Sequence, residues 1–102
     1  MVKEFQVKGL EKLINSSAIK EIYPMVDHID VRYNGDLYAP RGWGGMEFDI
    51  FLNDSTITKE NMYDKELDPH YLVDYHINQY LPYFNIDKSI SSFIVWDLDG
   101  NI

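Results

Sequence analysis

The sequence contains no cysteine among its 102 residues, which excludes disulfides, thiolate metal ligands and cysteine nucleophiles. It also lacks a long apolar run, since no stretch approaches the ~20 consecutive apolar residues of a membrane-spanning helix. A signal peptide is not expected, because charged residues interrupt positions 1–22 throughout. These absences favour a cytoplasmic protein without disulfides.

Positive charge is scarce. Nine Lys and Arg residues stand against 17 Asp and Glu residues, for a formal net charge of −8. The acidic excess follows residue 26, because residues 27–102 hold 14 acids and five bases. Such a surface repels phosphate backbones, so nucleic-acid binding is disfavoured. The acidity either serves solubility alone or complements a protein partner with a basic surface.

The most structured segment runs from residue 68 to residue 84. Asp68 is placed to cap a helix, and Pro69 suits the first helical position. Asn78 is expected on the polar side, and Pro82 should end or kink the helix near Leu81. At 100° per residue, one apolar stripe forms, consisting of Val73, Ile77, Tyr80, Leu81 and Phe84.

Other segments have weaker helical patterns. Residues 2–14 could form a helix that Gly9 weakens, although their first few residues could instead form a strand. A second helical piece is expected over 18–23, ending before Pro24, and a helical turn over 58–63.

Three segments alternate in polarity as strands do. The first begins at Val26 and directs Ile29, Val31 and Tyr33 to one side. The second covers residues 46–53, directs Met46, Phe48, Ile50 and Leu52 inward, and should pair antiparallel with the first through a long hairpin loop. The third covers residues 90–98 and has Ile90, Ile94, Trp96 and Leu98 on one face.

The pattern predicts a single α+β domain over residues 1–102 with the order α-β-β-(α)-α-β. Helices should cover one face of a small three-stranded sheet, with the last strand parallel to a hairpin strand. This order resembles the prokaryotic-type (type II) KH RNA-binding fold. That family holds RNA with a Gly-x-x-Gly loop, whereas the corresponding residues 61–68 here lack glycine and are acidic. A degenerate KH-like nucleic-acid binder is therefore one alternative.

The end of the chain offers candidate chemistry. The run Asp97-Leu98-Asp99-Gly100 after an apolar strand resembles the first motif of haloacid-dehalogenase-type phosphotransferases. The resemblance implies Asp97 as nucleophile, Asp99 as acid/base and a nearby Mg²⁺, although Asn101 replaces the usual Thr. The other interpretation is a polar turn at the end of a strand. We predict no catalytic residue, cofactor or metal, and keep a small metal-dependent phosphoester hydrolase as an alternative.

Candidate binding residues lie in two places. Arg41 and Trp43 occupy a glycine-rich stretch, and this pair of residue types is common at binding hot spots. A Trp43 side chain folded back over the sheet would instead be structural. Asp30, Glu47 and Asp49 should form an acidic outer face of the sheet that is exposed to water.

Residues 63–76, continuing to Tyr83-Phe84, resemble short uncharacterised proteins encoded by bacteriophages, as do Ile22-Tyr23-Pro24 and Ile29-Asp30-Val31. The resemblance implies a viral or mobile-element setting, in the host cytoplasm or the virion, but no activity. We expect a small acidic protein-interaction module, without enzymatic activity. Two versions are an inhibitor of a nucleic-acid-binding host protein and a virion or assembly component.

Overall fold

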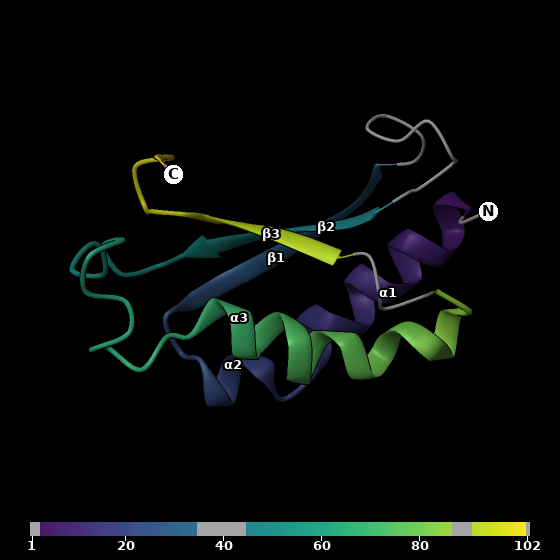
Figure 1. Ribbon diagram of the computed structural model, residues 1–102, viewed down its shortest axis with the longest axis horizontal. Helices are drawn as coiled ribbons and strands as arrows, with labels where there is room; N and C mark the ends of the chain where they lie inside the picture. Colours follow the sequence, from purple (N-terminus) through teal and green to yellow (C-terminus); the bar gives the residue numbers. More distant parts are fainter. Residues whose placement is uncertain (1–2, 35–44, 87–90, 102) are drawn as a thin grey trace.

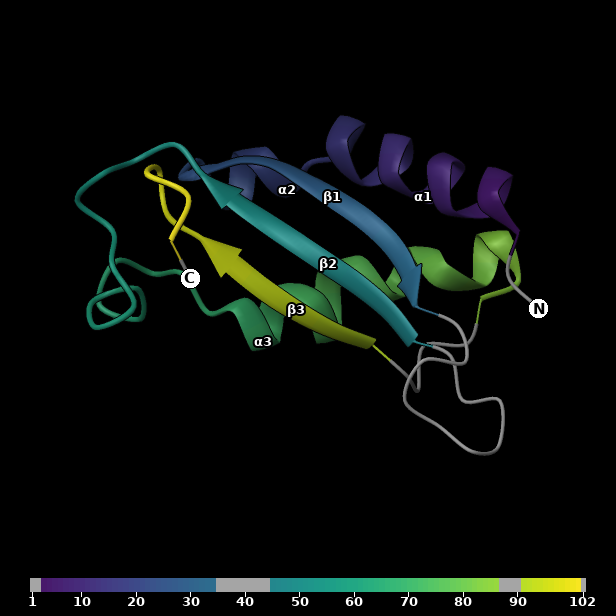
Figure 2. The ribbon, with the colours of Figure 1, turned by 90° about the horizontal axis from the view of Figure 1, so that it is seen from above.

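The computed structural model describes residues 3–34, 45–86 and 91–101. It shows the predicted α+β architecture, in which helices pack beneath one face of a three-stranded sheet (Figure 1). Seen from above, the strands lie side by side in the order β1-β2-β3, and no described helix crosses their upper face (Figure 2).

The N-terminal segment is helical, so the strand alternative for its first residues is wrong. Helix α1 spans Glu4–Ser16 and buries Leu10 and Ile14. The Gln6 side chain accepts a 2.6 Å hydrogen bond from the Lys3 backbone N–H at the start of this helix. A short helix, α2, covers Ile19–Ile22, and the chain then turns at Pro24 into the sheet.

The sheet has the predicted mixed topology. Strand β1 (Val26–Asn34) pairs antiparallel with β2 (Gly45–Leu52), and β2 pairs parallel with β3 (Ser91–Trp96). Between Val26 and His28 the register shifts by one residue, which places Asp27 in a bulge. The helix-facing side chains include the predicted set Ile29, Val31, Met46, Phe48, Ile50 and Leu52, all of which are buried.

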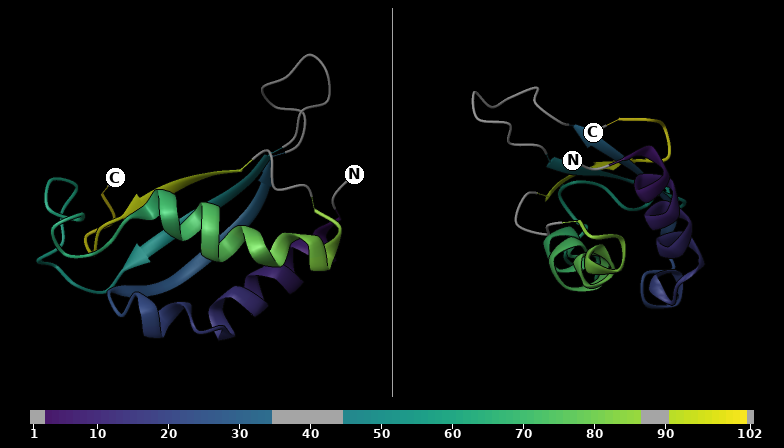
Figure 3. Two further views of the ribbon diagram at one scale, coloured as in Figure 1. Left: turned by 60° about the horizontal axis from the view of Figure 1, so that its bottom comes forward. Right: turned by 90° about the vertical axis from the view of Figure 1, so that its right-hand side faces the viewer.

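The segment after Asp68 forms one continuous helical rod that consists of three helix types in succession. Helix α3 (Pro69–Tyr71) begins at Asp68, whose carboxylate accepts a 3.2 Å hydrogen bond from the Tyr71 N–H. A π-helix, η2 (Leu72–Ile77), and a 3₁₀-helix, η3 (Asn78–Phe84), follow. Figure 3 shows this rod and α1 side by side beneath the sheet.

Two predictions for this rod were wrong. Asn78 is buried, at 7% exposed. The preceding π-helix has more residues per turn than an α-helix, so a position predicted on the polar side instead faces the core. The rod also continues past Pro82 to Phe84. Proline clashes with the carbonyl four residues back in an α-helix, and the tighter 3₁₀ winding avoids that arrangement.

The helical turn predicted at residues 58–63 is not a helix in the structure, where this segment is a succession of turns. Within it the Asn61 side chain accepts a 2.7 Å hydrogen bond from the Thr58 N–H. This segment places Met62 in the core, at 7% exposed, and leaves Tyr63 at the surface, at 57% exposed.

Helix α1 closes the outer edge of β1. Asn15 accepts a 2.9 Å hydrogen bond from the Ile29 N–H and donates a 2.8 Å bond to the Ile29 carbonyl. Glu11 accepts a 2.8 Å hydrogen bond from the Val31 N–H. These bonds satisfy backbone groups that an edge strand otherwise leaves unpaired.

Candidate functional site

The face of the sheet that points away from the helices is the candidate functional site, and we call it the open face. The register groups its outward residues into three rows that cross the strands. The rows are His28–Phe51–Trp96, Asp30–Asp49–Ile94 and Arg32–Glu47–Ser92. Alternation along each strand puts these side chains on the face opposite the core.

The first row consists of three nearly parallel rings. The His28 and Phe51 rings stack with their centroids 4.5 Å apart and an interplanar angle of 9°. The Phe51 and Trp96 rings are 6.1 Å apart, also at 9°. Cross-strand ring pairs of this kind stabilise the sheet, and they also give its open face an aromatic surface.

The other rows are joined by an ionic network centred on Asp49. Its carboxylate accepts hydrogen bonds of 3.0 and 3.2 Å from the Arg32 guanidinium and one of 3.2 Å from the Trp96 indole. Arg32 also pairs with Glu47 at 3.1 Å. The network spans all three strands and holds the Trp96 ring in place.

A second group of charges lies on β1 beside the aromatic row. The His28 Nδ1 atom is 2.7 Å from an Asp27 carboxylate oxygen, and its Nε2 atom is 3.6 Å from Asp30. The side chains of Asp27 and Asp30 are 60% and 54% exposed. These two carboxylates are therefore open to solvent and to a partner.

The structure brings the predicted residues Asp30, Glu47 and Asp49 onto this one face. Their availability differs, because Arg32 and Trp96 cover Asp49, which is only 9% exposed. Asp49 is therefore shielded from solvent, contrary to the prediction that this side of the sheet is exposed to water. Arg41 and Trp43 lie outside the described residues.

The aromatic row was missed as a site, although its signal is in the sequence. Alternation alone assigns His28 and Phe51 to the outer side of the first two strands, and it assigns Trp96 to one side of the third. What the sequence does not provide is the register that aligns His28 with Phe51 and Phe51 with Trp96.

The Asp97–Asn101 segment forms a polar turn after β3. One oxygen of Asp97 accepts hydrogen bonds of 2.9 Å from the Asp99 N–H and 2.7 Å from the Asn101 N–H. Gly100 takes a positive φ of 83°, which suits glycine. Within the described ranges, no three His, Asp or Glu side chains are grouped closely enough to hold a metal ion.

The described helices include none long and apolar enough to cross a membrane. Comparison of the chain with protein-family models, with curated proteins and with solved structures finds no significant match. The open face must therefore be interpreted from its own chemistry.

Proposed function

We propose that this protein is an acidic protein-interaction module that binds a positively charged partner through the open face. The observation that carries the proposal is the juxtaposition of the aromatic row with exposed carboxylates on a sheet face that no described helix covers. A partner's Arg or Lys side chain finds both of its preferred neighbours there, a carboxylate and an aromatic ring.

The charge of the open face favours a cationic protein over a nucleic acid. Among the described residues, the four carboxylates of Asp27, Asp30, Glu47 and Asp49 lie on or beside it, against the one guanidinium of Arg32. Aromatic rings on a sheet also stack with bases in single-strand binders, but those proteins add a basic groove for the backbone. The acidic network here would repel that backbone.

Two settings remain proposals, and each follows from the bacteriophage resemblance. In one, the open face occupies the basic groove of a nucleic-acid-binding host protein and inhibits it. In the other, the protein contacts a basic surface of the virion during assembly. Competition with nucleic acid for the partner distinguishes them, because only the inhibitor displaces the nucleic acid from the groove.

Binding of an arginine-rich synthetic peptide to wild type and two charge-reversal variants tests the proposal. Asp30→Lys replaces an exposed carboxylate of the open face, and Asp74→Lys makes the same change at an exposed position of η2. We expect Asp30→Lys to raise the dissociation constant about tenfold, because the variant loses an attractive charge and also introduces repulsion. Asp74→Lys should change the dissociation constant less than about twofold. Equal weakening by both variants would show that net charge, rather than the open face, governs binding.

A further inference from the structure

The two edges of the sheet are treated differently by the fold. Asn15 and Glu11 close the outer edge of β1, as described above. The outer edge of β3 has no such cover, since no described residue forms a hydrogen bond with its outward backbone groups. An edge strand of this kind is a template for another strand.

The composition of β3 adds to this asymmetry. Natural edge strands are usually protected from pairing by a lysine, another charge or a proline. The sequence of β3, Ser-Ser-Phe-Ile-Val-Trp, contains none of these and is rich in residues with high strand propensity. The strand is therefore suited to pairing along its outer edge.

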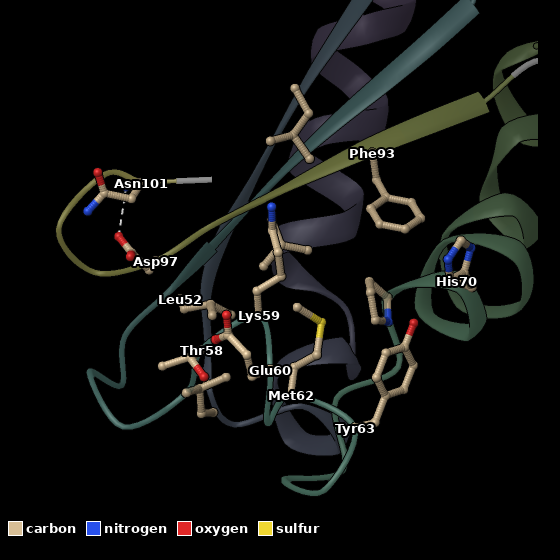
Figure 4. Close-up of a pocket in the computed structure, with 14 residues that line it drawn as sticks. Leu52, Thr58, Lys59, Glu60, Met62, Tyr63, His70, Phe93, Asp97 and Asn101 are labelled. Carbon is tan, nitrogen blue, oxygen red and sulfur yellow. Dashed lines mark hydrogen bonds between the residues drawn. The ribbon is translucent and has the colours of Figure 1, made fainter.

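A pocket lies beside that edge on the helix side of the sheet. It has a volume of about 650 Å³, and its apolar lining includes Ile57, Met62, Tyr63, Phe93 and Val95. In Figure 4 the Phe93 ring projects from β3 toward His70 of α3, and Met62 and Tyr63 form the opposite wall. The Phe93 and His70 rings pack edge to face, with their centroids 4.9 Å apart.

The pocket is correctly placed for a strand added to β3. Such a strand would lie about 4.8 Å beyond β3, with alternate side chains directed to opposite faces of the extended sheet. Those on the helix side would point into the space beside Phe93 and Val95. Pockets for alternate side chains, combined with backbone pairing, are how proteins bind peptides by strand addition.

Charge decides between a foreign peptide and a second copy of the chain. Residues 53–70 carry five acids and two lysines, and residues 91–101 carry two acids and no base. Glu60 and Asp97 stand at the rim of the pocket, together with Lys59. Two copies paired through β3 would bring these acidic segments together, whereas a cationic peptide would be attracted to them.

We propose that the outer edge of β3 binds an extended cationic peptide by strand addition, with an apolar side chain of the peptide in the adjoining pocket. This site shares β3 with the open face, but it uses the outer backbone edge of the strand and the pocket on the helix side, so it does not depend on the function proposed for the open face. The chemistry required of the ligand is an unblocked backbone, bulky apolar residues at alternate positions and Lys or Arg between them.

The test uses a synthetic peptide in which lysine alternates with leucine, and a matched peptide with prolines at alternate positions. The first should bind, and the second should not, because proline lacks the N–H needed for pairing. Hydrogen exchange should slow at the β3 amides when the first peptide is added. Equal binding of both peptides, or no binding of either, would overturn the proposal.

Protein variants locate the site. Tyr63→Ala removes a pocket wall at a 57% exposed position, and Tyr83→Ala makes the same change at a 74% exposed position of η3. We expect about tenfold weaker binding for Tyr63→Ala, no change for Tyr83→Ala, and less than about a twofold change for the open-face variant Asp30→Lys. If Asp30→Lys weakens binding and Tyr63→Ala does not, the peptide occupies the open face instead. A dimer that protects β3 without peptide would assign the edge to a second copy and would also overturn the proposal.

Discussion

Gly9 shows how one residue sets the spacing between two helices. A Cβ atom at this position would lie 2.7 Å from the Phe84 ring, which packs against α1 at the end of η3. The neighbouring Gln6 side chain donates a 2.5 Å hydrogen bond to the Phe84 carbonyl. The glycine that weakens the helical pattern of residues 2–14 therefore lies where α1 and η3 approach each other closely.

Asn78 is a buried polar residue whose side-chain oxygen has no hydrogen-bond partner among the described residues. An unsatisfied buried acceptor costs about 1–3 kcal/mol. We predict that Asn78→Leu, which has a similar size, raises the free energy of unfolding by about 1 kcal/mol in urea denaturation. Gln79→Leu, at an exposed neighbouring position, should change it little. A less stable Asn78→Leu would mean that the oxygen is bonded, for example to a buried water.

We predict that ionisation of Tyr23 lowers the free energy of unfolding at alkaline pH. Burial raises the pKa of its hydroxyl above the ordinary value of 10.0, and the charges of Asp68 and Tyr71 raise it further. The folded state therefore keeps the proton more tightly than the unfolded chain does. Its contribution to stability is complete below pH 10.0 and is lost as the pH rises through the folded-state pKa.

Measuring the free energy of unfolding across this alkaline range checks the prediction. Tyr23→Phe should lose less stability than wild type over that range, because phenylalanine has no proton to release. Tyr83→Phe, at a 74% exposed position, should follow wild type. Identical pH profiles for Tyr23→Phe and wild type would contradict the assignment.

Asn15 joins α1 to the edge of the sheet. It bonds both backbone groups of Ile29 and also donates to the Glu11 carbonyl within its own helix. We predict that Asn15→Ala lowers the free energy of unfolding by about 2 kcal/mol. Hydrogen exchange at the Ile29 amide should also become faster. Lys12→Ala, at an exposed position of the same helix, is the control, and an equal loss in both variants would mean that the bonds to Ile29 contribute nothing.

The sequence predicted the strands better than it predicted the rod after Asp68. Alternation is a strict signal, so the inward residues of β1 and β2 were correct, from Ile29 to Leu52. In the rod, the predicted apolar stripe depends on a constant 100° per residue, and the π-helix and the 3₁₀-helix depart from that value. These windings depend on packing against α1 and the sheet, which no local pattern records.

For the candidate site, the sequence supplied the residues but not their grouping. It predicted that Asp30, Glu47 and Asp49 share the outer face, which they do. It did not predict that Arg32 and Trp96 would cover Asp49, because that contact joins residues 47 positions apart. Long-range register is a property of the assembled sheet.

At the scale of the whole molecule, the helices lie on one side of the sheet and two differently built surfaces remain. The open face combines the aromatic row with exposed carboxylates, and the β3 edge combines unpaired backbone groups with a pocket. Both lie within an acidic chain, with a net charge of −8, and we propose cationic ligands for both. A ligand would contact mainly side chains on the open face, whereas it would contact mainly backbone groups at the β3 edge.

Residue-by-residue NMR mapping of the arginine-rich peptide tests the central claim most directly. The peptide should shift the amide signals of residues 27–32 and 47–51 and the indole signal of Trp96, which lie on the open face. The signals of α1 and of the rod at residues 69–84 should stay in place. Shifts confined to the helices, or spread evenly over every acidic residue, would contradict the assignment of the open face as the binding surface.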